Sequence, residues 1–537
     1  MATSLLPLDE LVSPLLSTRL LVLLVAAWAL NFVWRYRHGN AIGTNYRPDL
    51  WSPPGERFLV GHLPVLLKNK GRFLELWTTW LADCPPGRTI SITLPFRRLV
   101  NCSNPTALEY IQRGNFDNFV KGQTMYERLA TVLGDGIFTV DGATWHQQRK
   151  VTSKVFTPTL FRTAVSSSVS DNLVKLSATL DRHAERSDEF SLDDLFFRYT
   201  LSAFSDFSFS TDVHALSADG ETNEPVPFCS AFDTAQIELE RRFTNPFWKL
   251  SERWDGTGKV MRDANKTIDQ FVYGIIDQRE AEGKNSFTKE EKKEAEYTDL
   301  LSLYLAVEDE QGAKLSKQHV RDAALNLLLA GRDTTAEALS WCCYHLLKEN
   351  GVDDWAHMRA EVDKLGEVTY DSYKDFIYLN AVFLEALRLH PSVPRNGREA
   401  LADDQIPNGP RIEKGDIAFW SDWLMARDPF IWGEDASEFK PARWIDETGE
   451  LRKESQWRAH MFNGGYRICL GQTLATFEGI ACLAALVRDF DLRLAPSFYQ
   501  HTDFLEEGTP RYRGALTLSM DSPLTVQVAR RKTNGQA

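Results

Sequence analysis

The chain contains little cysteine and no excess of positive charge. Its 7 cysteines are scattered through 537 residues and none forms a C-x-x-C pair. This argues against a disulfide framework and a cysteine zinc site, and it favours a reducing compartment. The 61 Lys+Arg residues are outnumbered by 74 Asp+Glu, which gives a net charge of −13 at pH 7. Because nucleic-acid-binding proteins present a basic face, no nucleic-acid partner is expected.

Long apolar runs are scarce outside the N-terminus. The densest run, Leu20–Trp34, is by itself too short to cross a bilayer, which needs about 20 residues. Extending the run to residues 11–34 includes Pro14 and Arg19, and an arginine near a helix end can reach the lipid headgroups. We therefore predict a transmembrane anchor at residues 11–34.

The charges that flank this segment give it an orientation. Asp9 and Glu10 precede it and Arg35 and Arg37 follow it, so the positive-inside rule places the rest of the chain in the cytoplasm. The alternative is a cleaved secretory signal, because Ala27-Trp28-Ala29 loosely fits a cleavage site. The acidic N-terminus and the cysteine content favour the anchor. The predicted organisation is a tail, an anchor, a basic and proline-rich linker and one large domain, at residues 1–10, 11–34, 35–55 and 56–537.

Periodicity predicts that the large domain is mainly α-helical with small β-sheets. Thr89–Leu94 alternates like a strand, and Leu99–Cys102 is typical of its short partner. Ser316 is expected to cap a helix that runs to about Lys348. This helix is longer than is usual in a globular protein, so we expect it to cross the whole domain. Another helix is expected near residues 472–489.

One cysteine lies among glycines and an arginine, directly before that last helix. The start of a helix favours a thiolate through its dipole and its free amide donors, and glycines let a flat ligand approach the backbone. An arginine two residues earlier can pair with a carboxylate of a bound group. The stretch fits the pattern F-x-x-G-x-R-x-C-x-G, whose fixed positions are Phe462, Gly465, Arg467, Cys469 and Gly471.

This stretch resembles the cysteine loop of the haem-thiolate monooxygenases, the cytochrome P450 family. The resemblance extends over about residues 50–530 and implies the cytochrome P450 fold with haem b, iron protoporphyrin IX, as cofactor. It makes Cys469 the proximal ligand of the haem iron, and it gives Phe462, Gly465, Arg467 and Gly471 a part in binding the cofactor. One departure is Tyr466, where many members carry proline, and we expect ligation to persist.

Two other segments resemble the family's haem-propionate contacts. Trp145 and Arg149 match its W-x-x-x-R helix, and their spacing puts both on one helical face. Arg398 resembles another propionate partner. His146, between the first two, has no counterpart in the family and is expected at the surface.

A third segment resembles the family's Glu-Arg-Arg network. Glu385 and Arg388 are three residues apart on a predicted helix, and Arg443 follows in the stretch Phe439–Trp444. The resemblance makes these three residues a buried salt-bridge cluster. Their role is structural, and such clusters contribute to a unique arrangement more than to net stability.

An acid and two threonines interrupt the apolar sequence of the long helix, in the stretch Ala330–Thr335. The Thr334 hydroxyl can bond to the carbonyl of Ala330, four residues earlier, which bends a helix. Ala330 and Gly331 are expected to leave room for a diatomic ligand. The resemblance gives Asp333 and Thr334 the catalytic delivery of protons during oxygen activation.

The resemblance implies an enzyme that uses O2 and NADPH. A thiolate ligand increases the electron density at haem iron and favours O–O cleavage. No second electron-carrying domain is evident, so we expect an NADPH-cytochrome reductase as partner and an endoplasmic reticulum membrane location with one membrane pass. The expected docking charges are Arg149, Lys150, Lys154 and Arg467.

Several stretches, among them Asp194–Thr200 and His390–Pro394, resemble the fungal and plant branch that hydroxylates fatty acids and alkanes. We therefore predict a long-chain fatty acid or alkane hydroxylated at or near the chain end. The alternatives are an oxidase of a terpenoid or polyketide and a non-catalytic membrane protein that binds haem or lipid. Arg395 is a candidate partner of a substrate carboxylate, with a surface or haem-edge role as the alternative. By family position the pocket residues are Leu327, Ala330, Val393, Asn396 and Met520.

Overall fold

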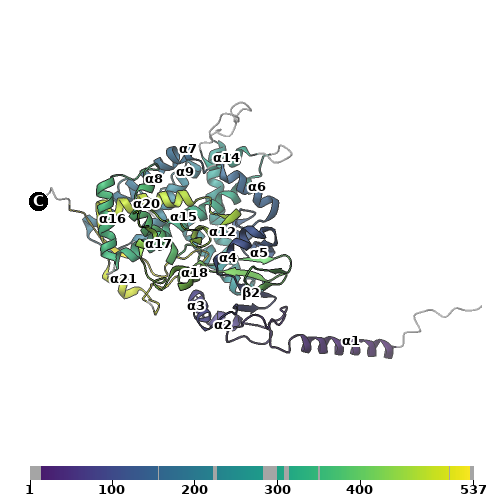
Figure 1. Cartoon of the computed structure of the whole chain (residues 1–537). Coiled ribbons are helices and arrows are strands. Elements are labelled where there is room, and N and C mark those ends of the chain that lie inside the picture. The colour runs from purple at the N-terminus through teal and green to yellow at the C-terminus, as the bar shows by residue number, and fades with distance from the viewer. Residues whose placement is uncertain are drawn as a thin grey trace, which may run out of the picture. The chain divides into compact units, whose positions relative to one another are not determined.

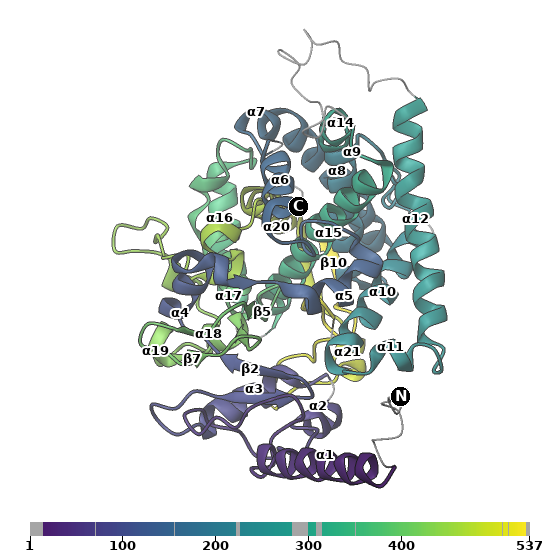
Figure 2. The same ribbon diagram turned by 90° about the vertical axis from the view of Figure 1, so that its right-hand side faces the viewer.

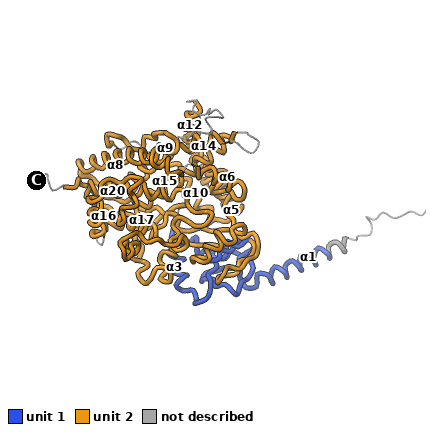
Figure 3. The backbone as a smooth tube through the Cα atoms, turned by 45° about the horizontal axis from the view of Figure 1, so that its top comes forward, with its two compact units in different colours: residues 1–101, 415–417 blue, residues 102–414, 418–537 orange. Residues whose placement is uncertain are grey.

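The chain divides into two compact units (Figure 3). One unit holds residues 1–101 with 415–417, and the other holds residues 102–414 with 418–537. The predicted domain boundary at residue 56 falls inside the first unit. The structure is a computed structural model, and it describes residues 14–69, 71–154, 156–221, 226–281, 299–307, 314–348, 351–506, 508–513 and 515–532, without the side chains of residues 14–19.

The first unit contains three helices and a strand pair among its described residues (Figure 1). Strands β1 and β2 are antiparallel, and Ser91 lies opposite Val100. The predicted hairpin is thus confirmed, and Phe96 takes a left-handed φ of 63° between its strands. The elements are α1 (Pro14–Arg35), α2 (Leu63–Lys68), α3 (Phe73–Asp83), β1 (Ser91–Leu94) and β2 (Arg97–Asn101).

Helix α1 covers most of the predicted anchor. From Leu20 to Trp34 its large apolar side chains are exposed, except Phe32, which is partly buried. Among the helices that the structure describes, none combines the length and the apolar character needed to cross a membrane. Residues 11–13, where the predicted anchor begins, lie outside the described residues.

The second unit is mainly helical (Figures 1 and 2). Its helices are α4 (Pro105–Glu109), α5 (Gly122–Leu133), α6 (Gly142–Ser153), α7 (Pro158–Leu160), α8 (Ser166–Arg186), α9 (Leu192–Phe209), α10 (Pro227–Thr244), α11 (Trp248–Ser251), α12 (Thr257–Ala281), α14 (Leu300–Ala306), α15 (Lys317–Leu347), α16 (Val352–Leu365), α17 (Ile377–Leu389), α18 (Asp422–Ala426), α19 (Pro429–Trp432), α20 (Gln472–Asp489) and α21 (Pro496–His501). The small sheets expected from the sequence are also present. Their strands are β3 (Phe119–Val120), β4 (Phe190–Ser191), β5 (Asn396–Ala400), β6 (Asp404–Gln405), β7 (Arg411–Ile412), β8 (Ile417–Trp420), β9 (Phe490–Leu494) and β10 (Thr525–Arg530).

Helix α15 is the central element of this unit. It has 31 residues and packs against α9, α17 and α20 (Figures 1 and 2). Its N-cap is Ser316, whose hydroxyl accepts the N–H of His319, and its C-cap is Lys348, so the predicted bounds are confirmed. Because the helix is surrounded by other helices, it is buried on nearly all sides rather than along one stripe.

The described strands pair into small sheets. In one sheet β5 lies between β8 and β3, and Phe119 of β3 is opposite Ala400 of β5. In another sheet β10 lies between β4 and β9, with Val526 opposite Leu494. A third, two-stranded sheet joins β6 and β7. Strand β5 follows α17 closely in sequence, and its residues Arg398 and Ala400 are buried.

Candidate functional site

The loop before α20 holds Cys469 in a fixed position. Its N–H donates to the carbonyl of Phe462 at 2.8 Å, so the six residues between them form a closed loop. The predicted helix begins at Gln472. As a result the amide groups of Gly471 and Gln472 donate to the sulfur, as the helix-start pattern predicts.

The surroundings of Cys469 act on the pKa of its thiol. The side chain is exposed, but burial raises the pKa of the thiol, against the opposing effects of two amides and the Arg149 charge. The helix start alone therefore does not make this thiol acidic, whereas a coordinated metal ion deprotonates a thiol outright.

Two glycines of the loop are required by protein packing. Gly465 has a left-handed φ of 58°, and a Cβ on it would lie 2.6 Å from the carbonyl oxygen of Gln112. A Cβ on Gly464 would lie 2.3 Å from the ring of Trp457. The expectation that the glycines serve a flat ligand is thus incomplete, because these two admit neighbouring parts of the chain. Gln112, whose side chain accepts the N–H of Gly464 at 3.1 Å, was not evident from the sequence.

Three buried cations gather around one carboxylate near this loop. Arg467 donates to Asp141 at 3.0 Å, while its Nε and one terminal nitrogen, and the Nε of Arg398, have no partner. Lys121 donates to two backbone carbonyls, one of them that of Ile137 at 2.9 Å. Burial lowers the pKa of Lys121 to about 6, and the charge of Arg467 is the next cause.

The same crowding acts on Arg398. Burial, and then the charge of Arg467, lowers the pKa of Arg398 to about 9. Unpaired buried cations are costly, so the cluster of Lys121, Arg398 and Arg467 calls for further negative charge. Two carboxylates of a bound group, such as the propionates of haem, meet that need. The residues present therefore fit the cofactor.

Trp145 and Arg149, the two residues of the W-x-x-x-R pattern, contact different groups. Trp145 is buried, and the guanidinium of Arg467 lies 4.4 Å from the centre of its ring. Arg149 donates to the carbonyl of Ile468 at 2.8 Å, which brings its charge beside the cysteine sulfur. His146 is exposed, as predicted.

Helix α15 has one small accessible patch. From Val320 to Leu346 every residue is buried except Ala330 and Thr334, which are four apart and therefore share a face. The Thr334 hydroxyl donates to the Ala330 carbonyl at 2.7 Å, so the predicted bond is present. Gly331 is different, because a Cβ on it would lie 2.0 Å from the ring of Phe204 in α9. The expectation that Gly331 leaves room for a diatomic ligand is wrong, because the Phe204 ring fills that space, whereas Ala330 and Thr334 are partly accessible.

Asp333 points toward α10. Its carboxylate accepts from Arg332 at 2.9 Å and from Gln236 at 2.7 Å, and Arg332 also contacts Asp233 at 2.8 Å. Burial raises the pKa of Asp333 to about 6, although Arg332 opposes this. Asp333 and Thr334 are thus neighbours in sequence whose side chains contact different parts of the fold.

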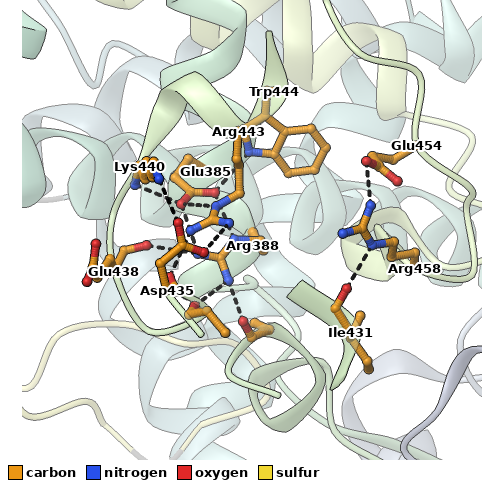
Figure 4. Close-up of polar contacts among 12 residues, drawn as sticks. Glu385, Arg388, Ile431, Asp435, Glu438, Lys440, Arg443, Trp444, Glu454 and Arg458 are labelled. Carbon is orange, nitrogen blue, oxygen red and sulfur yellow. Dashed lines mark hydrogen bonds and ion pairs between the residues drawn. The ribbon is translucent and has the colours of Figure 1, made fainter. Parts of the chain in front are cut away.

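The predicted Glu-Arg-Arg cluster is present and buried (Figure 4). Arg388 forms two contacts with Glu385, at 2.7 and 2.8 Å, and Arg443 reaches the same carboxylate at 2.9 Å. The indole of Trp444 donates to it at 2.9 Å, and Arg443 also meets Asp435 at 3.1 Å. Every oxygen of the Glu385 carboxylate therefore has partners.

The Cytochrome P450 family model matches residues 52–507. The chain belongs to the cytochrome P450 family. Cytochrome P450 monooxygenase cyp1 of Mycosarcoma maydis is 39% identical, over 98% of this chain and 82% of that relative. Cytochrome P450 704B1 of Arabidopsis thaliana is 28% identical over 95% and 99%, and cytochrome P450 704C1 of Pinus taeda is 32% identical over 83% and 87%. The protein is thus a haem-thiolate monooxygenase.

In this cytochrome P450, bound haem supplies oxygen activation at an iron that a thiolate makes electron-rich. Cys469 would hold the iron, and its two amide donors and Arg149 stabilise negative charge on the sulfur. Arg398 and Arg467 would hold the propionates. Lys121 is the third cation of this cluster. No motif in the sequence points to Lys121.

The remaining predicted residues of the P450 fall into accessible and buried sets. Lys150 and Lys154 are exposed, as a docking surface requires. Arg467 is not a docking charge, because its side chain is only 7% exposed and pairs with Asp141, and that expectation is corrected. Of the pocket residues, Ala330, Val393 and Asn396 are at least partly accessible, whereas Leu327 and Met520 are buried.

Proposed function

We propose that this cytochrome P450 hydroxylates a long-chain fatty acid or alkane at or near the chain end. It uses O2 and electrons that an NADPH-cytochrome reductase delivers. The observation that carries the proposal is the character of the accessible positions near the site. Val393 is 41% exposed although it is apolar, and the accessible turn of α15 presents Ala330 and the hydroxyl of Thr334, so these positions suit an apolar chain.

The sequence resemblance to fatty-acid and alkane hydroxylases of fungi and plants points the same way. The relatives described above come from a fungus and from two land plants. We propose that the accessible faces of Ala330, Val393 and Cys469 border one space, in which an apolar substrate lies against the haem. Leu327, Asn396 and Met520 complete the proposed pocket.

Protons reach the site through Asp333 and Thr334 in this proposal. A carboxyl with a pKa of about 6 exists in both protonation states near neutral pH, so it can receive and release protons. Its partner Arg332 also contacts Asp233, whose side chain is 45% exposed, and this connects the buried carboxyl to solvent. Thr334 holds its proton toward the Ala330 carbonyl until another acceptor is nearer.

We also propose that the predicted anchor, residues 11–34, attaches the enzyme to the endoplasmic reticulum membrane in a single pass, with the domain over residues 56–537 in the cytoplasm. The support is the row of exposed apolar side chains from Leu20 to Trp34, followed by Arg35 and Arg37. Extraction of cell membranes with carbonate should leave the full chain in the pellet. A chain that carbonate releases would contradict the anchor.

The test of the substrate is product analysis. The full chain is combined with reductase, NADPH and a panel of saturated acids and alkanes from twelve to eighteen carbons. We expect hydroxylation at or near the methyl end, dependent on NADPH and absent in Cys469→Ala. If no member of the panel yields a hydroxylated product while the haem-thiolate spectrum is intact, the substrate proposal is wrong.

A further inference from the structure

An ion pair joins the segment after α17 to helix α10. Arg395 contacts the carboxylate of Glu240, and the two side chains are 24% and 14% exposed. Arg395 follows the accessible pocket position Val393 by two residues and directly precedes β5. The pair is therefore partly buried and lies next to residues assigned to the substrate pocket.

Glu240 lies on the face of α10 that contacts the catalytic turn of α15. Gln236, one helical turn earlier on the same face, donates to Asp333 at 2.7 Å. Asp333 precedes the accessible Thr334. The α10 face that carries Gln236 and Glu240 thus extends from the proposed proton donors to the β5 segment.

Arg395 directly precedes a residue that contacts the proposed propionate-binding cluster. The next residue, Asn396, accepts from Arg398 at 2.7 Å, and Arg398 is one of the buried cations that would hold the propionates. A carboxylate bound to Arg395 would therefore place the first carbons of an acid, rather than its methyl end, near the haem.

The positive charge of Arg395 and the negative charge of Glu240 offset each other in surroundings that contain little solvent. Burial raises the pKa of Glu240, and Arg395 is the charged group that opposes this. In such surroundings an unbalanced guanidinium attracts a carboxylate strongly, because bonds between ionised groups are stronger than neutral ones. A carboxylate already in place beside the guanidinium removes most of that attraction.

We propose that Glu240 is a specificity residue that cancels the charge of Arg395 and so prevents a fatty acid from binding with its carboxylate at the haem end. The acid then enters with its methyl end toward the haem, which gives oxidation at or near that end. The inference rests on the proposed function and deepens it. It makes Glu240 a counter-charge of Arg395 beside the proposed pocket, and it leaves the alternative, a carboxylate anchor, as an outcome to be tested.

The test is Glu240→Gln, which removes the negative charge and keeps the side-chain size. We expect acids to bind about tenfold more tightly, measured by the substrate-induced change in haem absorbance. We also expect part of the product to move from the methyl end toward the carboxyl end. Alkanes of the same length carry no carboxylate, so their affinity and products should not change.

Two variants control this measurement. Glu238→Gln removes a carboxylate from the same helix that pairs with Arg241 at 2.5 Å, and it should leave acid affinity and product position at the wild-type values. Glu240→Gln combined with Arg395→Gln removes both charges and should restore methyl-end products. If Glu240→Gln leaves acid affinity and product position unchanged, or weakens acid binding, the proposal is wrong.

A further variant keeps the proposal testable if Glu240→Gln does not fold. Arg395→Gln should keep methyl-end oxidation of acids, since the proposal gives Arg395 no part in holding the carboxylate. A shift of the product position in Arg395→Gln would show that Arg395 is a carboxylate anchor. These outcomes can be distinguished from failure of the proposed function. In that case the wild-type enzyme would hydroxylate neither acids nor alkanes.

Discussion

A buried charge can stabilise one state of this enzyme and destabilise another, and Lys121 is the clearest example. Without haem, burial and the neighbouring Arg467 lower its pKa to about 6. With two propionates nearby, the same ammonium would have anionic partners. Lys121→Met should therefore stabilise the haem-free fold and weaken haem retention. We expect haem to transfer about tenfold faster to an excess of apomyoglobin, and the haem-free variant to unfold at a higher urea concentration.

The size of the Lys121 effect on the haem-free fold depends on pH. In haem-free protein the folded lysine binds fewer protons than the unfolded one between pH 6 and 10.5, so its contribution makes the fold more stable as pH rises through that window. Lys121→Met should lack this contribution. Equal haem transfer rates in variant and wild type would contradict a role beside the propionates.

A buried carboxyl shows the opposite dependence. Burial raises the pKa of Glu478 to about 8 from 4.5, with a Thr335 hydrogen bond opposing. The stability that the protonated group contributes is full below pH 4.5 and is lost as pH rises through 8. At pH 7 the loss amounts to about 3 kcal/mol. Glu478→Gln should remove it, so the unfolding midpoint of the variant should exceed that of wild type more at pH 8 than at pH 5.

The control for Glu478 is Glu367→Gln, because Glu367 is exposed. It should follow the wild-type pH dependence of unfolding. A Glu478→Gln curve parallel to wild type from pH 5 to pH 8 would mean that this carboxyl is ionised in the folded enzyme.

Among the elements, α17 depends on one carboxylate for its attachment to the segment Pro441–Trp444. Arg443→Met would leave the buried Glu385 with fewer partners, and such a loss typically costs about 3–5 kcal/mol. We expect a loss of about 3 kcal/mol in urea unfolding. Arg186→Met breaks an exposed pair with Glu221 at 2.7 Å and should leave the urea midpoint close to the wild-type value, because solvent screens exposed ion pairs. Equal losses in the two variants would contradict a special role for the cluster.

The elements also show what local sequence determines. The bounds of α15 and α20, the β1–β2 hairpin and the amides at Cys469 could be predicted, because caps, periodicity and glycine positions act over a few residues. The side of α15 that borders accessible space could not be predicted, because the helix is buried on nearly all sides and has no apolar stripe. For this reason the sequence predicts open space beside Gly331, whereas Gly331 packs against Phe204.

Contacts between distant parts of the chain explain the other omissions. Arg467 and Asp141 are 326 residues apart in sequence, and Arg395 and Glu240 are 155 apart. Neither pairing follows from spacing or propensity. The family resemblance supplied Arg467 and Arg398, but Lys121 required the folded chain. Charges that a fold brings together across such distances become apparent only from the tertiary structure.

At the scale of the whole molecule, the net charge of −13 makes exposed lysines the local exceptions in a mostly acidic protein. Lys150 and Lys154, at the C-terminal end of α6, are both exposed. They follow Arg149, which contacts the backbone beside Cys469. An acidic reductase would be attracted to this part of α6, on the side of the thiolate.

The double variant Lys150→Glu and Lys154→Glu should slow electron transfer from the reductase about tenfold at low salt, because opposite charges increase the association rate. The difference from wild type should shrink as ionic strength rises and the Debye length falls. Stopped-flow reduction under carbon monoxide measures both rates. The matched control reverses the exposed Lys364 and Lys374, which changes the net charge equally. If the control slows reduction as much, the effect belongs to total charge, and α6 is not the docking surface.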